Sequence, residues 1–291
     1  IMFKMHFGDE KFAKGLTNLI LYIAQPAMII APYIRDFDKR LMSGIVGVAI
    51  FSFIAHLLFY LIAVLSFKKV QINKRKVLRF AVLFSNSGYM GIPLIEALLG
   101  SDAAIYATVY NIGFNFFVWS LGCYIYTDDK SYVSPKKMFI NPATISIYVG
   151  LLIFFLPVNR FLPSVVISSV DMLKALVAPL SMMLVGFHMA SADFKGVFKD
   201  WDIWRCILLR LFVCPAAIFA LMKLADVTGI YSNAVAVTVV LLCSATPSAT
   251  SVNIFAEKFD CDTRTSGKIV PISTICALAS MPITALLLKL I

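Results

Sequence analysis

The sequence predicts an all-α polytopic membrane protein with two broken spans at matching places in its two halves. Hydrophobic residues make up 60% of the 291 residues and charged residues only 14%, whereas soluble domains contain about a quarter charged residues. Most of the apolar segments reach the ~20 residues that a spanning helix needs. Because hydrocarbon offers no hydrogen-bond partner to bare backbone, each span is expected to be helical. Nine segments follow one another: 15–34, 41–67, 77–99, 102–126, 141–158, 163–190, 201–223, 231–256 and 268–290.

An internal repeat runs through these spans. Pro26 and Pro93 are 67 residues apart, and Pro179 and Pro247 are 68 residues apart. The span that holds Pro179 is the fifth after the span that holds Pro26, and an odd number of crossings reverses the direction of the chain. We therefore expect two inverted halves, related by a pseudo-twofold axis in the membrane plane. The first half lacks one span, so an opening helix ahead of residue 15 would give ten in the intact protein. The single membrane domain 1–291 would thus divide into repeats 1–126 and 141–291.

Basic residues orient the spans. Seventeen Lys and Arg residues lie in one set of loops and in the N-terminal stretch, against six in the opposite set. The positive-inside rule therefore predicts that the first set is cytoplasmic and that the C-terminus lies outside. Most of the net charge of +10 is thus a topology signal, and no nucleic-acid partner is expected. The loops predicted to be cytoplasmic are 68–79, 127–140, 191–200 and 257–268.

Each half contains one apolar segment that is interrupted in the middle. The first interruption reads Ser85-Asn86-Ser87-Gly88-Tyr89-Met90-Gly91-Ile92-Pro93, and the second reads Ser244-Ala245-Thr246-Pro247-Ser248-Ala249-Thr250-Ser251. Glycine permits non-helical backbone angles, and proline cannot donate the helical hydrogen bond. We expect half-helices to begin after Pro93 and Pro247, with their positive N-terminal ends and unpaired N–H groups at the centre of the protein. Two such ends would bind a carboxylate without a buried lysine.

The predicted substrate site combines both interruptions with one face of span 102–126. Asn111 and Asn115 are four residues apart, so they share a helix face. They would line the site, or else hold helices together through their amides. The interruptions themselves could also be packing devices, since small residues let helices approach closely. The candidate substrate-binding residues are Asn86, Ser87, Gly88, Gly91, Pro93, Asn111, Asn115, Thr246, Pro247, Ser248, Thr250 and Asn253.

Two ionisable residues inside spans are candidates for a coupling or charge role. His56 would carry a proton, or else be a satisfied packing residue. Arg210 would attract an anion, or else pair with a structural partner. The sequence contains no metal-ligand cluster, catalytic triad or phosphate loop, so we expect no enzyme, no metal and no cofactor. Coupling to H⁺ or Na⁺ stays open.

Several of these motifs resemble those of one transporter family. Residues 86–94, which read N-S-G-Y-M-G-I-P-L, are similar to the N-x-x-x-M-G-I-P-L signature of the auxin efflux carrier family. Ala245-Thr246-Pro247-Ser248 resembles the ninth helix of that family, and Arg210-Leu211-Phe212-Val213-Cys214-Pro215 resembles an Arg-x-x-x-x-Pro pattern in its eighth. The short loop 127–140 lacks the long insert of plant members and indicates a bacterial plasma membrane protein. Glu96 stands where plant members tend to have lysine, which argues against auxin itself.

The resemblance implies an architecture and a class of substrate. It implies ten helices in two inverted five-helix repeats, a fold shared with bile acid/sodium symporters. A scaffold part (15–34 and 141–190) would hold a transport part (41–126 and 201–290) that moves as an elevator, in a homodimer. Helices four and nine would cross at the site for a small organic anion.

The sequence therefore favours a secondary transporter for a mono- or dicarboxylate such as malate. An ion-coupled antiporter or a sodium/bile-acid-type symporter is the first alternative. Such proteins are expected to carry aspartates at the crossing, and neither interruption contains one. A channel or a membrane sensor on the same fold is the second alternative.

Overall fold

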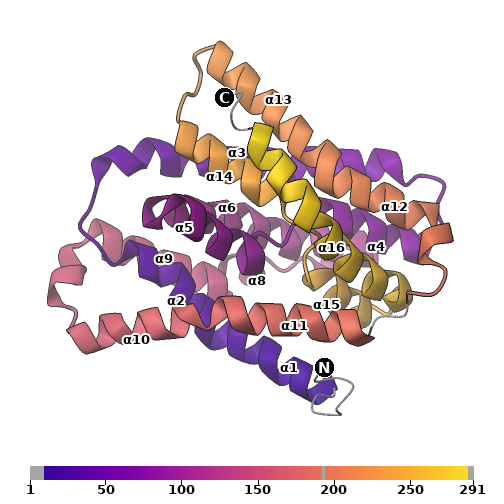
Figure 1. Ribbon diagram of the computed structural model, residues 1–291, viewed down its shortest axis with the longest axis horizontal. Coiled ribbons are helices and arrows are strands. Elements are labelled where there is room, and N and C mark those ends of the chain that lie inside the picture. The colour runs from indigo at the N-terminus through magenta and orange to yellow at the C-terminus, as the bar shows by residue number, and fades with distance from the viewer. Residues whose placement is uncertain (1–9, 192–193, 288–291) are drawn as a thin grey trace.

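The computed structural model describes residues 10–191 and 194–287, and it is a bundle of helices (Figure 1). The N-terminal stretch 1–9, part of loop 191–200 and the last four residues lie outside the described residues. All nine predicted spans form helical segments there, and the only strand-like pairing in this part of the chain is one isolated bridge. Five of the spans are continuous helices long and apolar enough to cross a membrane.

The first half contributes four spans, of which the third is broken. Gln71 begins the broken span by accepting a hydrogen bond from the Lys74 amide at 3.1 Å, so this helix starts earlier than the predicted residue 77. The helices of this half are α1 (Glu10–Leu19), α2 (Gln25–Ile30), α3 (Met42–Ser66), α4 (Ile72–Leu83), α5 (Ile92–Leu99), α6 (Ser101–Phe117) and α7 (Cys123–Thr127).

The second half contributes five spans, of which the fourth is broken. Two of them begin with asparagine caps: Asn141 accepts from the Thr144 amide and Asn233 from the Ala236 amide, both at 3.0 Å. After the short connecting helix α8 (Pro135–Phe139) come α9 (Pro142–Phe155), α10 (Ser164–Ala175), α11 (Val177–Ser191), α12 (Trp201–Leu208), α13 (Cys214–Val227), α14 (Ala234–Ala245), α15 (Ser251–Lys258) and α16 (Thr263–Leu287).

Three prolines inside spans share one local structure. A widened, π-helical turn ends two residues before Pro26, before Pro93 and before Pro215. Proline lacks the N–H of a helical hydrogen bond, and its ring clashes with the carbonyl four residues earlier. In all three cases that carbonyl lies within the widened turn, which moves it away from the ring.

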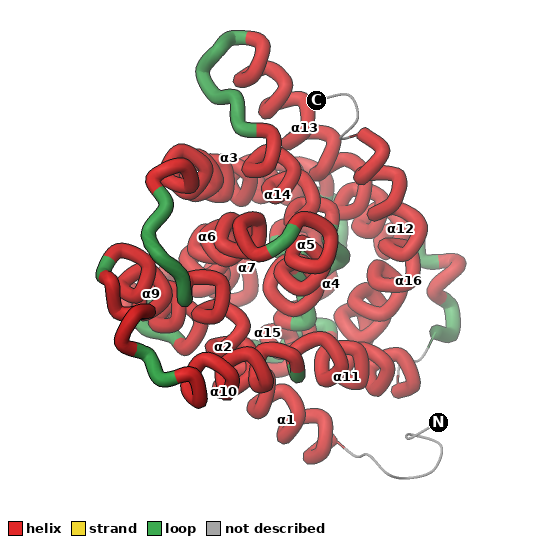
Figure 2. Tube along the Cα trace, turned by 60° about the vertical axis from the view of Figure 1, so that its left-hand side comes forward, coloured by secondary structure: helices red, strands yellow, loops and turns green. Residues whose placement is uncertain are grey.

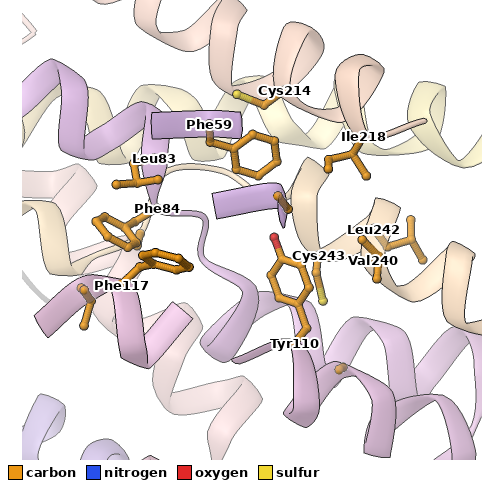
Figure 3. Packing of buried hydrophobic residues seen from close by; sticks show 14 of the residues in the cluster. Phe59, Leu83, Phe84, Tyr110, Phe117, Cys214, Ile218, Val240, Leu242 and Cys243 are labelled. Carbon is orange, nitrogen blue, oxygen red and sulfur yellow. The ribbon is translucent and has the colours of Figure 1, made fainter. Parts of the chain in front are cut away.

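The core lies between α3, α4, α6 and α14, and its large side chains are aromatic. Phe59, Phe80 and Phe84 are fully buried there, and Figure 3 shows Phe59 and Phe84 together with Phe117 within this core. The opposite face of α3 is a stripe of exposed apolar side chains spaced three or four residues apart, as expected for a face in contact with lipid. The stripe consists of Val46, Ile50, Ile54, Leu57, Leu61 and Leu65.

The broken spans lie at the centre of the bundle. Figure 2 shows α4 and α5 in the interior, surrounded by other helices, and α4 contacts α3, α7, α12, α15 and α16. The lipid-facing helices therefore enclose the two interruptions, which is the only place where unwound backbone is tolerated at membrane depth.

Candidate functional site

Both interruptions are unwound, as predicted, and they cross each other. Helix α4 ends at Leu83, and Phe84 is extended with φ −107° and ψ 117°. Helix α14 ends at Ala245, and Thr246 is extended with φ −64° and ψ 152°. The prediction that a half-helix begins after Pro93 is wrong, because the helix resumes at Ser87. The widened turn at Ser87–Gly91 accommodates Pro93 without a break, so Pro93 lies within the half-helix and not ahead of it.

The two unwound segments pair with one another through their backbones. The Asn86 amide donates to the Pro247 carbonyl at 2.7 Å, and the Ala249 amide donates to the Phe84 carbonyl at 3.0 Å. Ser85 and Ser248 face each other as a single antiparallel bridge. The crossing therefore satisfies its own innermost backbone groups, which removes the amides of Asn86 and Ala249 from the donors that a ligand could use.

A cavity of about 330 Å³ opens beside the crossing. The first amides of the half-helix that starts at Ser87 have no intrahelical acceptor, and the following residues Gly88 and Tyr89 line this cavity. None of its lining residues among the described residues is charged. Its polar lining residues are Gln25, Ser85, Asn86, Asn111, Asn115, Asn141, Thr250 and Ser251, and its aromatic ones are Tyr22, Tyr89, Phe114, Trp119 and Phe255.

The structure brings five of the predicted site residues to the cavity: Asn86, Gly88, Asn111, Asn115 and Thr250. The two asparagines of α6 also brace their own helix, because the Asn111 amide group donates to the Ala107 carbonyl and that of Asn115 donates to the Asn111 carbonyl. The two asparagines therefore do both: they line the cavity, and their amides bind backbone carbonyls of their own helix.

Several other predicted residues lie behind the cavity wall. Ser87 is fully buried, and its hydroxyl donates to Asn111 Oδ1 at 3.1 Å. The Thr246 hydroxyl donates to the Cys243 carbonyl at 2.9 Å, and the Ser248 hydroxyl donates to the Ala81 carbonyl at 3.0 Å. These three side chains fix the shape of the crossing.

The remaining predicted residues also lie outside the cavity lining. Gly91 faces Thr246, since an added Cβ would lie 3.5 Å from Thr246 Cγ2. Pro247 takes part through its carbonyl, and Pro93 lies in α5. The Asn253 side-chain oxygen is buried without a hydrogen-bond partner among the described residues.

Arg210 lies next to the crossing and connects the two broken spans, α4 and α14. The side chain is fully buried. One guanidinium nitrogen donates to the Val82 carbonyl at 2.8 Å, and the other donates to the Ser244 carbonyl. These carbonyls belong to the last turns of α4 and α14, which leave carbonyls without helical partners. The guanidinium also lies 4.9 Å above the Phe59 ring, and no carboxylate of the described residues pairs with it.

The comparison with known proteins agrees with this architecture. The model of a family described as membrane transport protein matches residues 4–285. The chain belongs to this membrane transport protein family. This confirms the resemblance to the auxin efflux carriers drawn from the sequence motifs.

Two archaeal relatives extend over nearly the same length. The chain is 27% identical over 283 residues to an uncharacterized transporter of Methanocaldococcus jannaschii, covering 94% of this chain and 89% of the relative. It is 24% identical over 286 residues to an uncharacterized transporter of Methanothermobacter thermautotrophicus, covering 96% and 90%.

In this membrane transport protein, His56 lies outside the cavity. Its Nδ1 is 2.7 Å from the Ser52 carbonyl in the preceding turn, whereas Nε2 is buried without a partner among the described residues. Five aromatic rings surround the imidazole: Phe59, Phe84, Tyr110, Phe114 and Phe117. His56 thus packs against the side of the crossing that carries Phe84.

Sequence reasoning missed four polar residues of the cavity: Gln25, Ser85, Asn141 and Ser251. Gln25 directly precedes Pro26, the proline used to recognise the first repeat. That neighbourhood was the one sequence signal that could have pointed to Gln25. Its Nε2 would lie 3.2 Å from a Cβ added to Gly88, which shows how closely α2 approaches the first interruption. Asn141 is the N-cap of α9, and nothing local relates that cap to a site formed by other spans.

Proposed function

We propose that this membrane transport protein is a secondary active transporter for a small organic anion, in particular a mono- or dicarboxylate such as malate. The observation that carries the proposal is the charge at the crossing. Each half-helix end bears about half an elementary charge, so the N-terminal ends at Ser87 and Ser251 offset the C-terminal ends of α4 and α14. The guanidinium of Arg210 then leaves about one positive charge at the crossing, and the described lining of the cavity beside the crossing contains no acidic residue.

The cavity offers donors that suit a carboxylate. The amides at the start of the half-helix, near Gly88 and Tyr89, point along the positive end of the helix dipole. Asn86 and Gln25 contribute side-chain amides, and a carboxylate can accept from several of these donors at once. The aromatic residues of the lining would contact the carbon skeleton of the substrate.

The position of Arg210 is also relevant to which ion is coupled to transport. The carbonyl ends of α4 and α14 are the groups that would coordinate a cation at a helix crossing, and the Arg210 guanidinium already occupies them. This favours an anion carrier over a sodium-coupled symporter that binds its cation at these carbonyls. Coupling to protons is a separate matter that the pH dependence of uptake decides.

An elevator movement in a homodimer is part of the proposal. Helix α2 packs against α9 and α10, whereas α3 packs mainly against α4, α6 and α14, which supports a scaffold and a transport part. The ion pairs Arg35–Asp102 and Lys174–Glu96 connect the two parts. Helix α10, which belongs to the scaffold, has no buried residue in this chain, so its face is available to a second copy.

Uptake of labelled malate into proteoliposomes tests the proposal. Asn86→Ala should lower the initial rate several-fold at equal protein content, because the variant removes a hydrogen-bond donor from the cavity. It removes no side-chain hydrogen bond that the described residues use to hold the fold together. Asn73→Ala is the matched control, since Asn73 is an exposed asparagine of the same span, and it should transport normally. Undiminished uptake by Asn86→Ala would remove Asn86 from the site. Non-saturable flux would indicate a channel, and binding without uptake a sensor.

A further inference from the structure

A second cavity, of about 570 Å³, lies on the loop face beyond the crossing. Its lining comes from four places in the chain: the start of α4, the π-helical turn and α7 that follow α6, the loop with α8, and the end of α15. Three of its lining residues are lysines and none of those described is acidic. The basic basin, as we name it, is lined by Lys76, Trp119, Cys123, Tyr126, Thr127, Tyr132, Lys137, Lys258 and Phe259.

Two of the three lysines have no anionic partner among the described residues. Lys76 pairs with Asp128 at 3.0 Å and donates to the Tyr126 carbonyl at 2.7 Å. In contrast, Lys137 and Lys258 place their ammonium groups 5.0 and 5.4 Å from the centre of the Trp119 ring. No described carboxylate lies within ion-pair distance of either. Two like charges held near one ring create a local positive potential that an anion would reduce.

Trp119 belongs to both cavities. It lines the basic basin on one side and the crossing cavity on the other. It lies in the π-helical turn Val118–Gly122, a local structure that often marks functional sites. The Phe255 ring, which lines the crossing cavity, is 5.5 Å from the Trp119 ring. The two rings therefore form the partition between the basin and the crossing.

We propose that the basic basin is a second binding site for small organic anions, which a substrate occupies on its way to or from the crossing. Lys137 and Lys258 attract the carboxylate, and the Trp119 ring contacts the organic part and separates the two sites. The loops that supply these lysines are those predicted to be cytoplasmic. The identity of the anion as the transported substrate rests on the proposed function, whereas anion binding by the basin does not.

Fluorescence quenching of Trp119 tests the basin without any transport. Replacing the other two tryptophans, as Trp201→Phe and Trp204→Phe, leaves Trp119 as the reporter in nanodiscs of phosphatidylcholine, which carry no net lipid charge. Iodide is an anionic quencher and acrylamide a neutral one. We expect Lys137→Gln with Lys258→Gln to lower the iodide quenching constant several-fold and to leave the acrylamide constant unchanged.

The matched control is Lys130→Gln with Lys136→Gln. It removes the same amount of charge from the loop that holds Lys137, but from lysines outside the basin lining. Equal iodide quenching in the two double variants would overturn the proposal, because the basin would then not concentrate anions. Malate should protect Trp119 from iodide in the parent and not in Lys137→Gln with Lys258→Gln. An absence of protection in the parent would overturn the assignment to organic anions.

Lipid headgroups are the other source of anionic chemistry. Quenching in nanodiscs of phosphatidylglycerol separates the two sources, since protection seen only with that lipid would assign the lysines to a headgroup and overturn the proposal. In proteoliposomes, the basin variant should raise the KM for malate several-fold from the basin side and leave kcat unchanged. A complete lack of malate transport by the parent would count against the proposed function, while the iodide result would still decide anion binding by the basin.

Discussion

Arg210 shows how a membrane interior accommodates an arginine that no described carboxylate pairs with. Its guanidinium presents five N–H groups in a planar fork, and the carbonyls at the ends of α4 and α14 accept from two of its nitrogens. The last turns of α4 and α14 leave carbonyls without a helical N–H partner, and the Arg210 guanidinium donates to carbonyls of both helices at once. The Phe59 ring adds a cation–π contact. The sequence left open whether this residue attracts an anion or has a structural partner, and the partners it has are backbone carbonyls.

Removal of this charge should be costly to the fold. We expect Arg210→Met to destabilise the protein by about 3 kcal/mol, because it strands buried polar groups, and to abolish malate uptake. Arg210→Lys keeps the charge but loses the fork, so it should recover part of the stability. The midpoint of thermal unfolding in detergent measures both. Arg205→Gln, an exposed arginine on α12, is the control. A normal melting midpoint for Arg210→Met would contradict the structural role.

At the scale of the element, the widened turns before prolines determine which way the neighbouring side chains point around the helix axis. Arg210 lies in the turn Leu209–Val213, which ends just before Pro215. The turn adds a residue relative to a regular helix, so it decides which side chains of α12 and α13 face the crossing. Pro215 thus acts on the crossing through Arg210, although it does not line the cavity.

Pro215→Ala tests this coupling. The alanine restores the missing N–H and removes the ring, so the turn can relax toward a regular helix and rotate Arg210 away from its carbonyls. Malate uptake should fall several-fold while the helix content measured by circular dichroism stays the same. Pro282→Ala is the control, because Pro282 lies inside α16 where no widened turn precedes it. Equal uptake by both variants would mean that local packing, and not the proline, holds the turn.

The elements were predictable to the extent that they depend on local sequence. Apolar length defined the nine spans, and clustered Gly, Pro, Asn and Ser defined both interruptions. The restart at Ser87 was not predictable, because pairing with the segment around Pro247 determines where the unwound stretch ends. Asn86 and Gly88 could be placed at the site since they belong to an interruption. Gln25 could not, because its position depends on how α2 packs.

At the scale of the whole molecule, two groups of helices lie side by side. Figure 1 shows α1, α2, α10 and α11 along one edge of the bundle, away from α3, α12, α13 and α14. The pairs Arg35–Asp102 and Lys174–Glu96 join the groups through partly exposed side chains. Exposed ion pairs contribute only about 0–1 kcal/mol each, so they would not prevent one group from sliding past the other.

A cross-link between the groups should therefore stop transport. In a background free of native cysteines, Lys174→Cys with Glu96→Cys would join α10 to α5 through a bifunctional thiol reagent with a reducible spacer. Uptake should be lost on cross-linking and return on reduction. Lys74→Cys with Asp202→Cys is the control, since that pair joins α4 and α12 within the proposed transport part. Full uptake by the cross-linked Lys174/Glu96 pair would contradict an elevator movement.

The backbone pairing of Asn86 with Pro247 has a consequence for biogenesis. When the ribosome has released the first broken span, the partner of its open peptide groups has not yet been synthesised. Hydrocarbon cannot solvate those groups in the meantime. The early spans must therefore wait inside the translocon, near water, or with an insertion chaperone until the later half arrives. A truncated first half should be recognised by membrane quality control as unassembled.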